Sequence, residues 1–168
     1  MRTRLRFGAL AAGTALLGAA PTAALAGTAS STMSVTATVT ANCTVSTTAL
    51  AFGNVDTISG SNFDNTGSLS IRCTNGTAWS ATAGVGSGPL AGYANRKMTA
   101  GANVLNYNIY TTAARTVVWG DGTSSTSPIG GTGTGNAQSV TVYGRVGSGQ
   151  TSVPAGAYTD TVAVTVTY

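Results

Sequence analysis

Residues 33–45 read Met-Ser-Val-Thr-Ala-Thr-Val-Thr-Ala-Asn-Cys-Thr-Val. Apolar or small residues alternate with polar ones throughout, which is the pattern of a β-strand with one buried face. Thirteen extended residues span about 43 Å, whereas a domain of this size has a radius of gyration of about 14–15 Å. We therefore expect the part near Cys43 to pair inside its own domain. The part from Met33 to Val39 is expected to extend beyond the domain and to need a partner for its apolar face.

The residues before this stretch have the pattern of a secretory signal peptide. Arg2, Arg4 and Arg6 form a basic region, an apolar run follows over residues 8–20, and an Ala-Leu-Ala cleavage site ends at Ala26. We expect residues 1–26 to be removed. An N-terminal membrane anchor is the alternative, but the apolar run is shorter than the about 20 residues that a spanning helix needs.

The composition of the remaining 142 residues favours a single exported β-domain. Three of the eight basic residues lie in the predicted signal peptide, which leaves five against four acidic residues. This balance gives no basic patch and argues against a nucleic-acid partner. The chain contains no histidine, and it is rich in Thr and Val, which favour strands, and in Gly and Ser, which favour turns.

Cys43 and Cys73 are the only two cysteines. Because an exported chain meets an oxidising compartment, we predict one disulfide between them. Two free thiols and a two-ligand metal site are the alternatives. The metal site is the poorer one, since there is no histidine and no further cysteine to complete it.

The rest of the chain reads as short strands separated by turns, and it contains no convincing amphipathic helix. Residues 54–67, 84–92, 123–135 and 147–156 are predicted loops, and Asn75-Gly76 is predicted to join two strands in a hairpin. The predicted strands are residues 50–52, 69–73, 77–85, 104–110, 116–119, 138–146 and 158–168. The fold class is therefore all-β, an antiparallel β-sandwich of immunoglobulin-like character.

The final predicted strand places Val162, Val164, Val166 and Tyr168 on one face. It ends at Tyr168 without a polar tail, so we expect the chain to end inside the sheet. The first strand, in contrast, is too long. A sandwich that lacks a strand at one end and has a spare strand at the other is expected to be completed by a neighbouring molecule.

The sequence also resembles the spore coat protein U family, which includes the pilins of archaic chaperone–usher pili. The resemblance covers nearly all of the chain after the signal peptide, and it depends on the order and spacing of several short motifs. These are Ala41-Asn42-Cys43-Thr44-Val45, Leu50-Ala51-Phe52-Gly53, Ile71-Arg72-Cys73-Thr74-Asn75-Gly76, Leu105-Asn106-Tyr107-Asn108-Ile109-Tyr110, Ala114-Arg115-Thr116, Val142-Tyr143-Gly144-Arg145, Gly156-Ala157-Tyr158-Thr159-Asp160-Thr161 and the terminal Val-Thr-Val-Thr-Tyr.

The resemblance implies a structural subunit of a surface pilus that supports adhesion or biofilm formation. In such pilins the two cysteines form a disulfide, the fold lacks its last strand, and the N-terminal extension of the next subunit fills the gap. This places the donor role on Met33, Val35, Ala37 and Val39, within an extension of residues 27–40 that precedes a pilin domain of residues 41–168. The implied partners are other pilin subunits, a periplasmic chaperone and an outer-membrane usher, which is the only contact with a membrane. The implied location is the cell surface, reached through the periplasm.

Three alternatives stay open. An alternating N-terminal strand is commonly an edge strand of its own sheet. The chain could also be a secreted coat protein that is monomeric or forms a layer without pili. The third alternative is a carbohydrate-binding adhesin domain, in which Trp79, Trp119, Tyr93, Tyr107 and Tyr110 would stack on sugars, although large aromatic side chains more often belong to the core.

An enzyme is the least favoured class. The common general base, histidine, is absent, and the serines therefore have no histidine partner. Asp56, Asp64 and Asp121 lie in Gly- and Asn-rich segments where Asp is a routine turn residue. Asp160 opens the last strand, and Arg145 or another cation could pair with it. The sequence predicts no catalytic residue, no metal site and no cofactor.

Overall fold

The computed structural model describes residues 25–168, so residues 1–24 of the predicted signal peptide lie outside the described residues. The described residues form eight strands and no helix. None of their segments is a helix long and apolar enough to cross a membrane. The strands are β1 (Cys43–Thr47), β2 (Phe63–Cys73), β3 (Ala78–Ala83), β4 (Arg96–Ala100), β5 (Asn103–Tyr110), β6 (Ile129–Thr132), β7 (Gln138–Val146) and β8 (Val164–Thr167).

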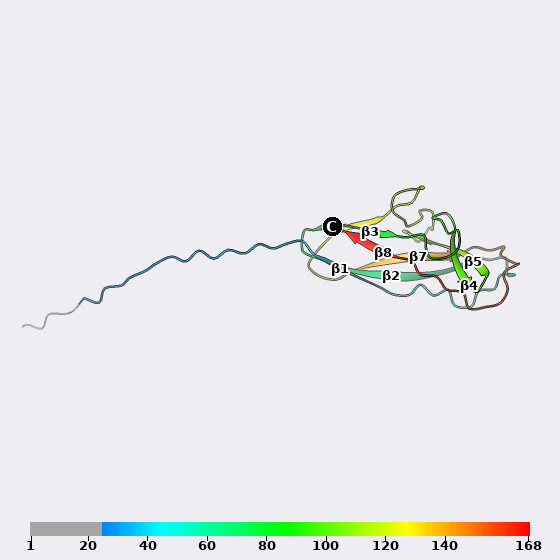
Figure 1. Cartoon of the computed structure of the whole chain (residues 1–168), viewed down its shortest axis with the longest axis horizontal. Helices are drawn as coiled ribbons and strands as arrows, with labels where there is room; N and C mark the ends of the chain where they lie inside the picture. Colours follow the sequence, from blue (N-terminus) through cyan, green and yellow to red (C-terminus); the bar gives the residue numbers. More distant parts are fainter. Residues whose placement is uncertain (1–24) are drawn as a thin grey trace, which may run out of the picture. The chain divides into compact units, whose positions relative to one another are not determined.

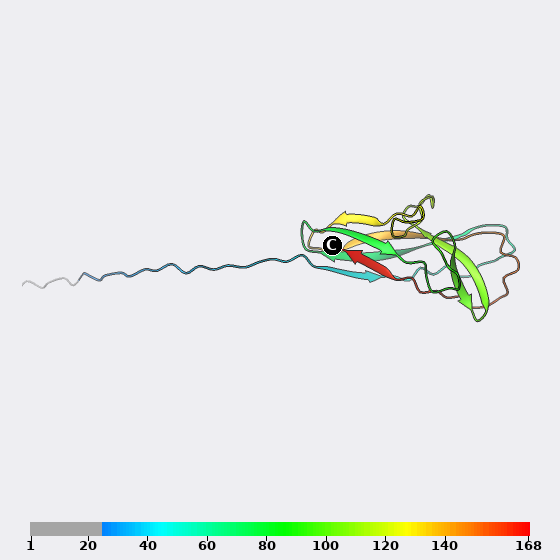
Figure 2. The same ribbon diagram turned by 45° about the horizontal axis from the view of Figure 1, so that its top comes forward.

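The strands form two antiparallel sheets that face each other across a common core (Figure 1). One sheet has five strands in the order β1-β2-β7-β5-β4, and the other has three in the order β6-β3-β8. This confirms the predicted all-β, immunoglobulin-like sandwich. β1 and β8 are each the last strand of their sheet, and they lie on the same side of the sandwich (Figure 2).

Alternating residues of the strands fill the space between the sheets. Leu105, Tyr107 and Ile109 of β5 are at most 7% exposed, as the period-2 pattern predicts. Trp79 and Trp119 are also buried, which favours a core role over sugar stacking for these two residues.

Asn75-Gly76 forms a turn but not the predicted hairpin. The Thr77 N–H donates to the Thr74 carbonyl at 3.0 Å, and Gly76 has φ +81°. Both edges of β2 are already used, because β1 pairs on one side and β7 on the other. The turn therefore carries the chain from the five-stranded sheet to β3 in the other sheet.

Several strand boundaries also differ from the prediction. β2 begins inside the predicted loop 54–67, because it pairs with β7 from Phe63 onward. β6 lies inside the predicted loop 123–135, where Gly131 leaves room for the ring of Trp79 on β3. Residues 50–52 form no strand, and residues 116–119 form only isolated bridges to Tyr110 and Ser127. β1 begins only at Cys43, β8 begins only at Val164, and the strand β4 was not predicted.

Leu50 and Phe52 cover the five-stranded sheet although they are not in a strand. Their side chains pack over Gly144 of β7. A Cβ atom at Gly144 would lie 2.6 Å from Leu50 Cδ2 and 2.8 Å from Phe52 Cζ. Only glycine lets this segment come so close to the sheet, so the apolar residues after β1 line the interior instead of continuing the strand.

Arg96 of β4 is completely buried. Its Nη1 donates to Asn108 Oδ1 at 2.6 Å, and its Nη2 donates to the Trp119 carbonyl at 2.7 Å. The Gly84 carbonyl accepts from both Nε and Nη2, at 2.9 Å and 2.8 Å. Arg96 thus connects β4 and β5 to the end of β3 and to the segment that carries Trp119.

Cys43 and Cys73 occupy paired positions of β1 and β2 and are joined by a disulfide. The two residues are 30 apart in sequence. Closing a loop of this size restricts the unfolded chain and, in the chain-entropy description, stabilises the fold by about 3–4 kcal/mol.

We expect the double substitution Cys43→Ser and Cys73→Ser to lower the free energy of unfolding by about 3–4 kcal/mol in urea titrations of the mature chain. Reductant should have the same effect on the wild type and none on the double variant. Equal unfolding midpoints for all samples would contradict a stabilising role for the bond.

Candidate functional site

A groove with a volume of about 1010 Å³ opens between the two sheets. One wall is the segment after β1, residues 47–58, and the other is the segment before and at the start of β8, residues 153–164. The floor consists of buried apolar side chains of both sheets and their connections. These are Leu69, Leu105, Tyr107, Ile109, Trp119 and Val142.

The groove reaches the core of the molecule. Every residue of its floor is at most 7% exposed, whereas the walls carry apolar side chains that are only half-buried, such as Phe52, Val55 and Val162. The groove is therefore bordered by half-buried apolar side chains, and the packed core forms its floor.

The strand β8 presents an unpaired edge beside this groove. Among the described strands β8 pairs only with β3, and the Gly84 N–H donates to the Ala163 carbonyl at 2.9 Å. Backbone groups of an antiparallel strand point alternately to its two sides. Since Ala163 points toward β3, the backbone N–H and C=O groups of Val162, Val164 and Val166 point toward the open side. An unpaired edge of this kind is a template for another strand.

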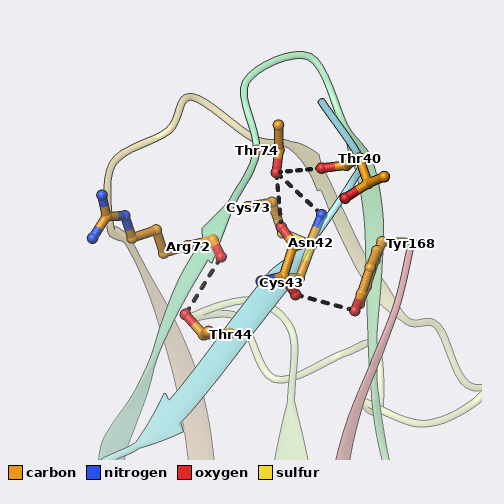
Figure 3. Close-up of a disulfide and its surroundings, with 8 residues drawn as sticks. All are labelled: Thr40, Asn42, Cys43, Thr44, Arg72, Cys73, Thr74 and Tyr168. Carbon is orange, nitrogen blue, oxygen red and sulfur yellow. Dashed lines mark hydrogen bonds between the residues drawn. A yellow bond between two sulfur atoms is a disulfide. The ribbon is translucent and has the colours of Figure 1, made fainter. Parts of the chain in front are cut away.

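The four residues predicted on one face of the last strand differ in burial in the structure. The side chains of Val162, Val164 and Val166 are half-buried and pack against the core. Tyr168 is 55% exposed, because it lies beyond the last register pair, Ser80 with Thr167. Its hydroxyl donates to Asn42 Oδ1 at 3.4 Å, which connects the end of β8 to the start of β1 (Figure 3).

Asn42 is held where the N-terminal segment joins the sandwich. Its backbone N–H donates to Thr74 Oγ1 at 3.1 Å, and its carbonyl accepts from the Thr74 N–H at 2.9 Å. The disulfide of Cys43 follows directly (Figure 3). The chain is therefore fixed to β2 from Asn42 onward.

Residues 25–42 contain no helix and no strand, and all of them are exposed. Residues 25–37 belong to a unit separate from the sandwich. Met33, Val35 and Val39 are 84–87% exposed, and Ala37 is exposed too. The alternating apolar face thus has no cover within the described part of the chain.

Two charged positions correct the sequence interpretation. Asp64 lies in β2 and not in a turn, and it is the partner of Arg145. Arg145 Nε and Nη2 donate to its two oxygens at 2.7 Å and 2.8 Å, and Arg115 Nη1 lies 3.3 Å away. Asp160 does not pair with Arg145. It accepts hydrogen bonds from Tyr107 and Ser87 at the edge of the groove.

The ion pairs of Asp64 with Arg145 and Arg115 are expected to make the free energy of unfolding sensitive to acid. The hydrogen bond from Arg145, with the charges of Arg145 and Arg115, lowers the pKa of Asp64 below its ordinary value of 3.8. Because the folded-state pKa lies below that of the unfolded chain, this stability is complete above about pH 4 and is lost as the pH falls through the folded-state pKa. The thermal midpoint of the wild type should fall between about pH 5 and pH 2 as Asp64 takes up a proton, and we expect this fall to be smaller in Asp64→Asn. An unchanged pH profile would contradict the assignment.

Nothing in the described residues forms a metal site, because no group of three His, Cys, Asp or Glu side chains comes together there. Sequence reasoning missed the wall that residues 47–58 form, whereas Val162 and Val164 of the other wall are among the predicted site residues. The available signal was four apolar residues, Leu50, Phe52, Val55 and Ile58, in a segment otherwise rich in turn residues.

Comparisons with known proteins agree with this architecture. Residues 29–165 match the family described as Spore Coat Protein U domain. Protein U of Myxococcus xanthus is 38% identical over 109 residues, which are 61% of this chain and 59% of that protein, so the match spans about three fifths of the relative's length.

A solved structure is also similar. It is a chain of the CsuC–CsuE chaperone–tip adhesion subunit pre-assembly complex from the archaic chaperone–usher Csu pili of Acinetobacter baumannii. The TM-score is 0.58 at 22% identity, and the match covers 78% of this chain and 40% of that chain, which shows a common fold. The family match covers residues 29–165, most of the chain, so this chain belongs to the Spore Coat Protein U domain family.

Proposed function

We propose that this chain is a structural subunit of a surface pilus that is assembled by the chaperone–usher pathway through donor-strand exchange. The N-terminal extension of one copy, residues 27–40, fills the groove of the next copy, whose sandwich is formed by residues 41–168. The observation that carries the proposal is the open apolar groove beside the unpaired edge of β8, in a chain that also has an exposed alternating segment.

The two surfaces match in length and in pattern. Residues 33–39 extend over about 23 Å, the same length as the seven residues from Val162 to Tyr168 along the open edge. In strand addition, main-chain hydrogen bonds supply affinity and alternate side chains enter pockets. Met33, Val35, Ala37 and Val39 are the alternate side chains. Burial of each Met or Val contributes up to about 1.5–3 kcal/mol, and Ala37 contributes less.

Donation from head to tail has a defined consequence for assembly. The donor surface and the groove are different surfaces of one subunit, and contacts of this kind produce an open fibre. Before assembly the unfilled groove is an aggregation hazard. A periplasmic chaperone would therefore cover the groove, and at an outer-membrane usher the donor strand of the next subunit would replace the chaperone. The similar Csu structure is a pre-assembly complex of a chaperone with a tip adhesion subunit. The resulting surface fibre would support adhesion or biofilm formation.

The test is the assembly state of material sheared from the cell surface, analysed on denaturing gels without and with heating. The full chain should give a ladder of multimers that collapses to a monomer on heating, and a chain without residues 27–40 should give no ladder. A single monomer band from both chains would overturn the proposal and favour a coat protein that forms no pilus.

A further inference from the structure

The chain crosses from one sheet to the other immediately before β8. Thr159 exchanges two backbone hydrogen bonds with Thr99 of β4, at 2.8 Å and 3.0 Å. Four residues later, the Ala163 carbonyl accepts from the Gly84 N–H at the end of β3. Residues 159–163 therefore connect the five-stranded sheet to the three-stranded sheet, and they lead into the open edge of the groove.

A single carboxylate organises this crossing. Asp160 Oδ2 accepts from the Tyr107 hydroxyl at 2.6 Å, and Asp160 Oδ1 accepts from the Ser87 N–H and hydroxyl at 2.7 Å and 2.8 Å. The Thr161 N–H donates to Oδ1 as well, at 2.7 Å. Tyr107 belongs to β5 of one sheet, whereas Ser87 follows β3 of the other sheet. Asp160 thus fixes the crossing segment to both sheets.

The backbone at Gly86 lies very close to this carboxylate. Gly86 has φ +92°, and a Cβ atom on it would lie 2.1 Å from Asp160 Oδ2, so no other residue fits there without a shift. Burial raises the pKa of Asp160, but the hydrogen bonds from Tyr107 and Ser87 outweigh burial and lower it below 3.8. Burial and the hydrogen bond to Asp160 raise the pKa of Tyr107. At neutral pH the pair is therefore a carboxylate acceptor and a phenol donor.

We propose that Asp160, held by Tyr107, is a positioning residue for the strand that enters the groove. Both residues line the groove, and Asp160 lies two residues before Val162, the first residue whose backbone faces the open edge. β8 itself has only four register pairs with β3, so its direction depends on how the preceding segment is held. This inference rests on the donor-strand function proposed above. It assigns a role to the Asp160 of the Gly-Ala-Tyr-Thr-Asp-Thr motif.

The experiment measures release of a donor peptide from the full mature chain. The probe is a fluorescent peptide of residues 27–40, which is loaded during refolding and then displaced by excess unlabelled peptide. We expect Asp160→Asn and Tyr107→Phe each to release the peptide about tenfold faster than wild type, since hydrogen bonds to charged groups are the stronger ones. The double variant should be little worse than either single variant, because both substitutions disrupt the same contact.

Asp64→Asn is the matched control. It also removes a hydrogen-bonded carboxylate, but Asp64 lies in β2 and does not line the groove. It should lower the thermal midpoint without changing peptide release. Release rates of Asp160→Asn and Tyr107→Phe equal to wild type, or an equal acceleration by Asp64→Asn, would overturn the positioning role and leave the donor-strand proposal intact. If the wild-type chain takes up no peptide, the donor-strand proposal itself fails. Tyr107→Phe removes a single hydroxyl, so it keeps the test decisive if Asp160→Asn does not fold.

Discussion

Replacing Val35 and Val39 together with aspartate is expected to reduce the heat-sensitive multimers at least about a hundredfold. In the proposed fibre each valine enters an apolar groove, and its burial contributes up to about 1.5–3 kcal/mol. The double substitution removes both contributions, and it also forces two carboxylates into a site whose floor is apolar. Band intensities of sheared material on unheated gels measure the loss. The subunit should persist in the periplasm as a chaperone-bound monomer.

The alternation of the segment supplies a matched control. Thr36→Asp with Thr38→Asp introduces the same two charges on the opposite, polar face. This variant should form fibres in amounts close to wild type. Normal fibres from the valine variant would refute the donor assignment. An equal loss from both variants would mean that the charge of the segment matters and that its apolar face does not.

Replacing Arg96 with methionine is expected to lower the free energy of unfolding by about 5 kcal/mol. The substitution keeps much of the volume of the side chain but removes the Arg96 donors from the Gly84 and Trp119 carbonyls. Asn108 Oδ1 loses one of its two donors and keeps the Ile109 N–H. Removing one partner from a buried charged network costs about 3–5 kcal/mol, and domains are stable by only about 5–15 kcal/mol. Urea titration followed by tryptophan fluorescence measures the loss, since both tryptophans are buried.

Arg72 provides the comparison for Arg96. It is exposed and donates a single hydrogen bond, at 2.8 Å, to the Gly135 carbonyl. Arg72→Met should change the free energy of unfolding by less than about 1 kcal/mol. Similar losses from the two variants would show that the buried network of Arg96 contributes little beyond the general effect of removing an arginine.

The regular strands could be predicted because apolar and polar residues alternate wherever one face of a strand is buried. β7 has the predicted bounds, and Leu105, Tyr107 and Ile109 of the predicted strand 104–110 alternate along β5 and are all buried. Pairing between segments that are distant in sequence produces no such local pattern. Asn75-Gly76 favours a tight turn in any context, so only the occupied edges of β2 decide that the turn leads to another sheet. β6 contains two glycines and became a strand because β3 was available to pair with it.

For the candidate site, the alternating segment could be predicted from the sequence, but most of the groove could not. The excess length of the alternating segment predicts a spare strand that needs a partner. The walls of the groove, the buried Arg96 and the Asp160–Tyr107 pair depend on contacts between residues far apart in sequence. Arg96 and Asp160 appear in the sequence as ordinary surface charges, because neither residue type is commonly buried.

The disulfide lies where a pulled fibre would transmit its load. In the proposed assembly, tension on one subunit enters through its own N-terminal segment, which is fixed from Asn42 onward. The first cross-link that this force meets is the bond from Cys43 to Cys73, so the force passes covalently into β2. β2 is paired along both edges, with β1 and with β7. In that assembly the load bypasses the short edge strand β1 and enters the interior of the larger sheet.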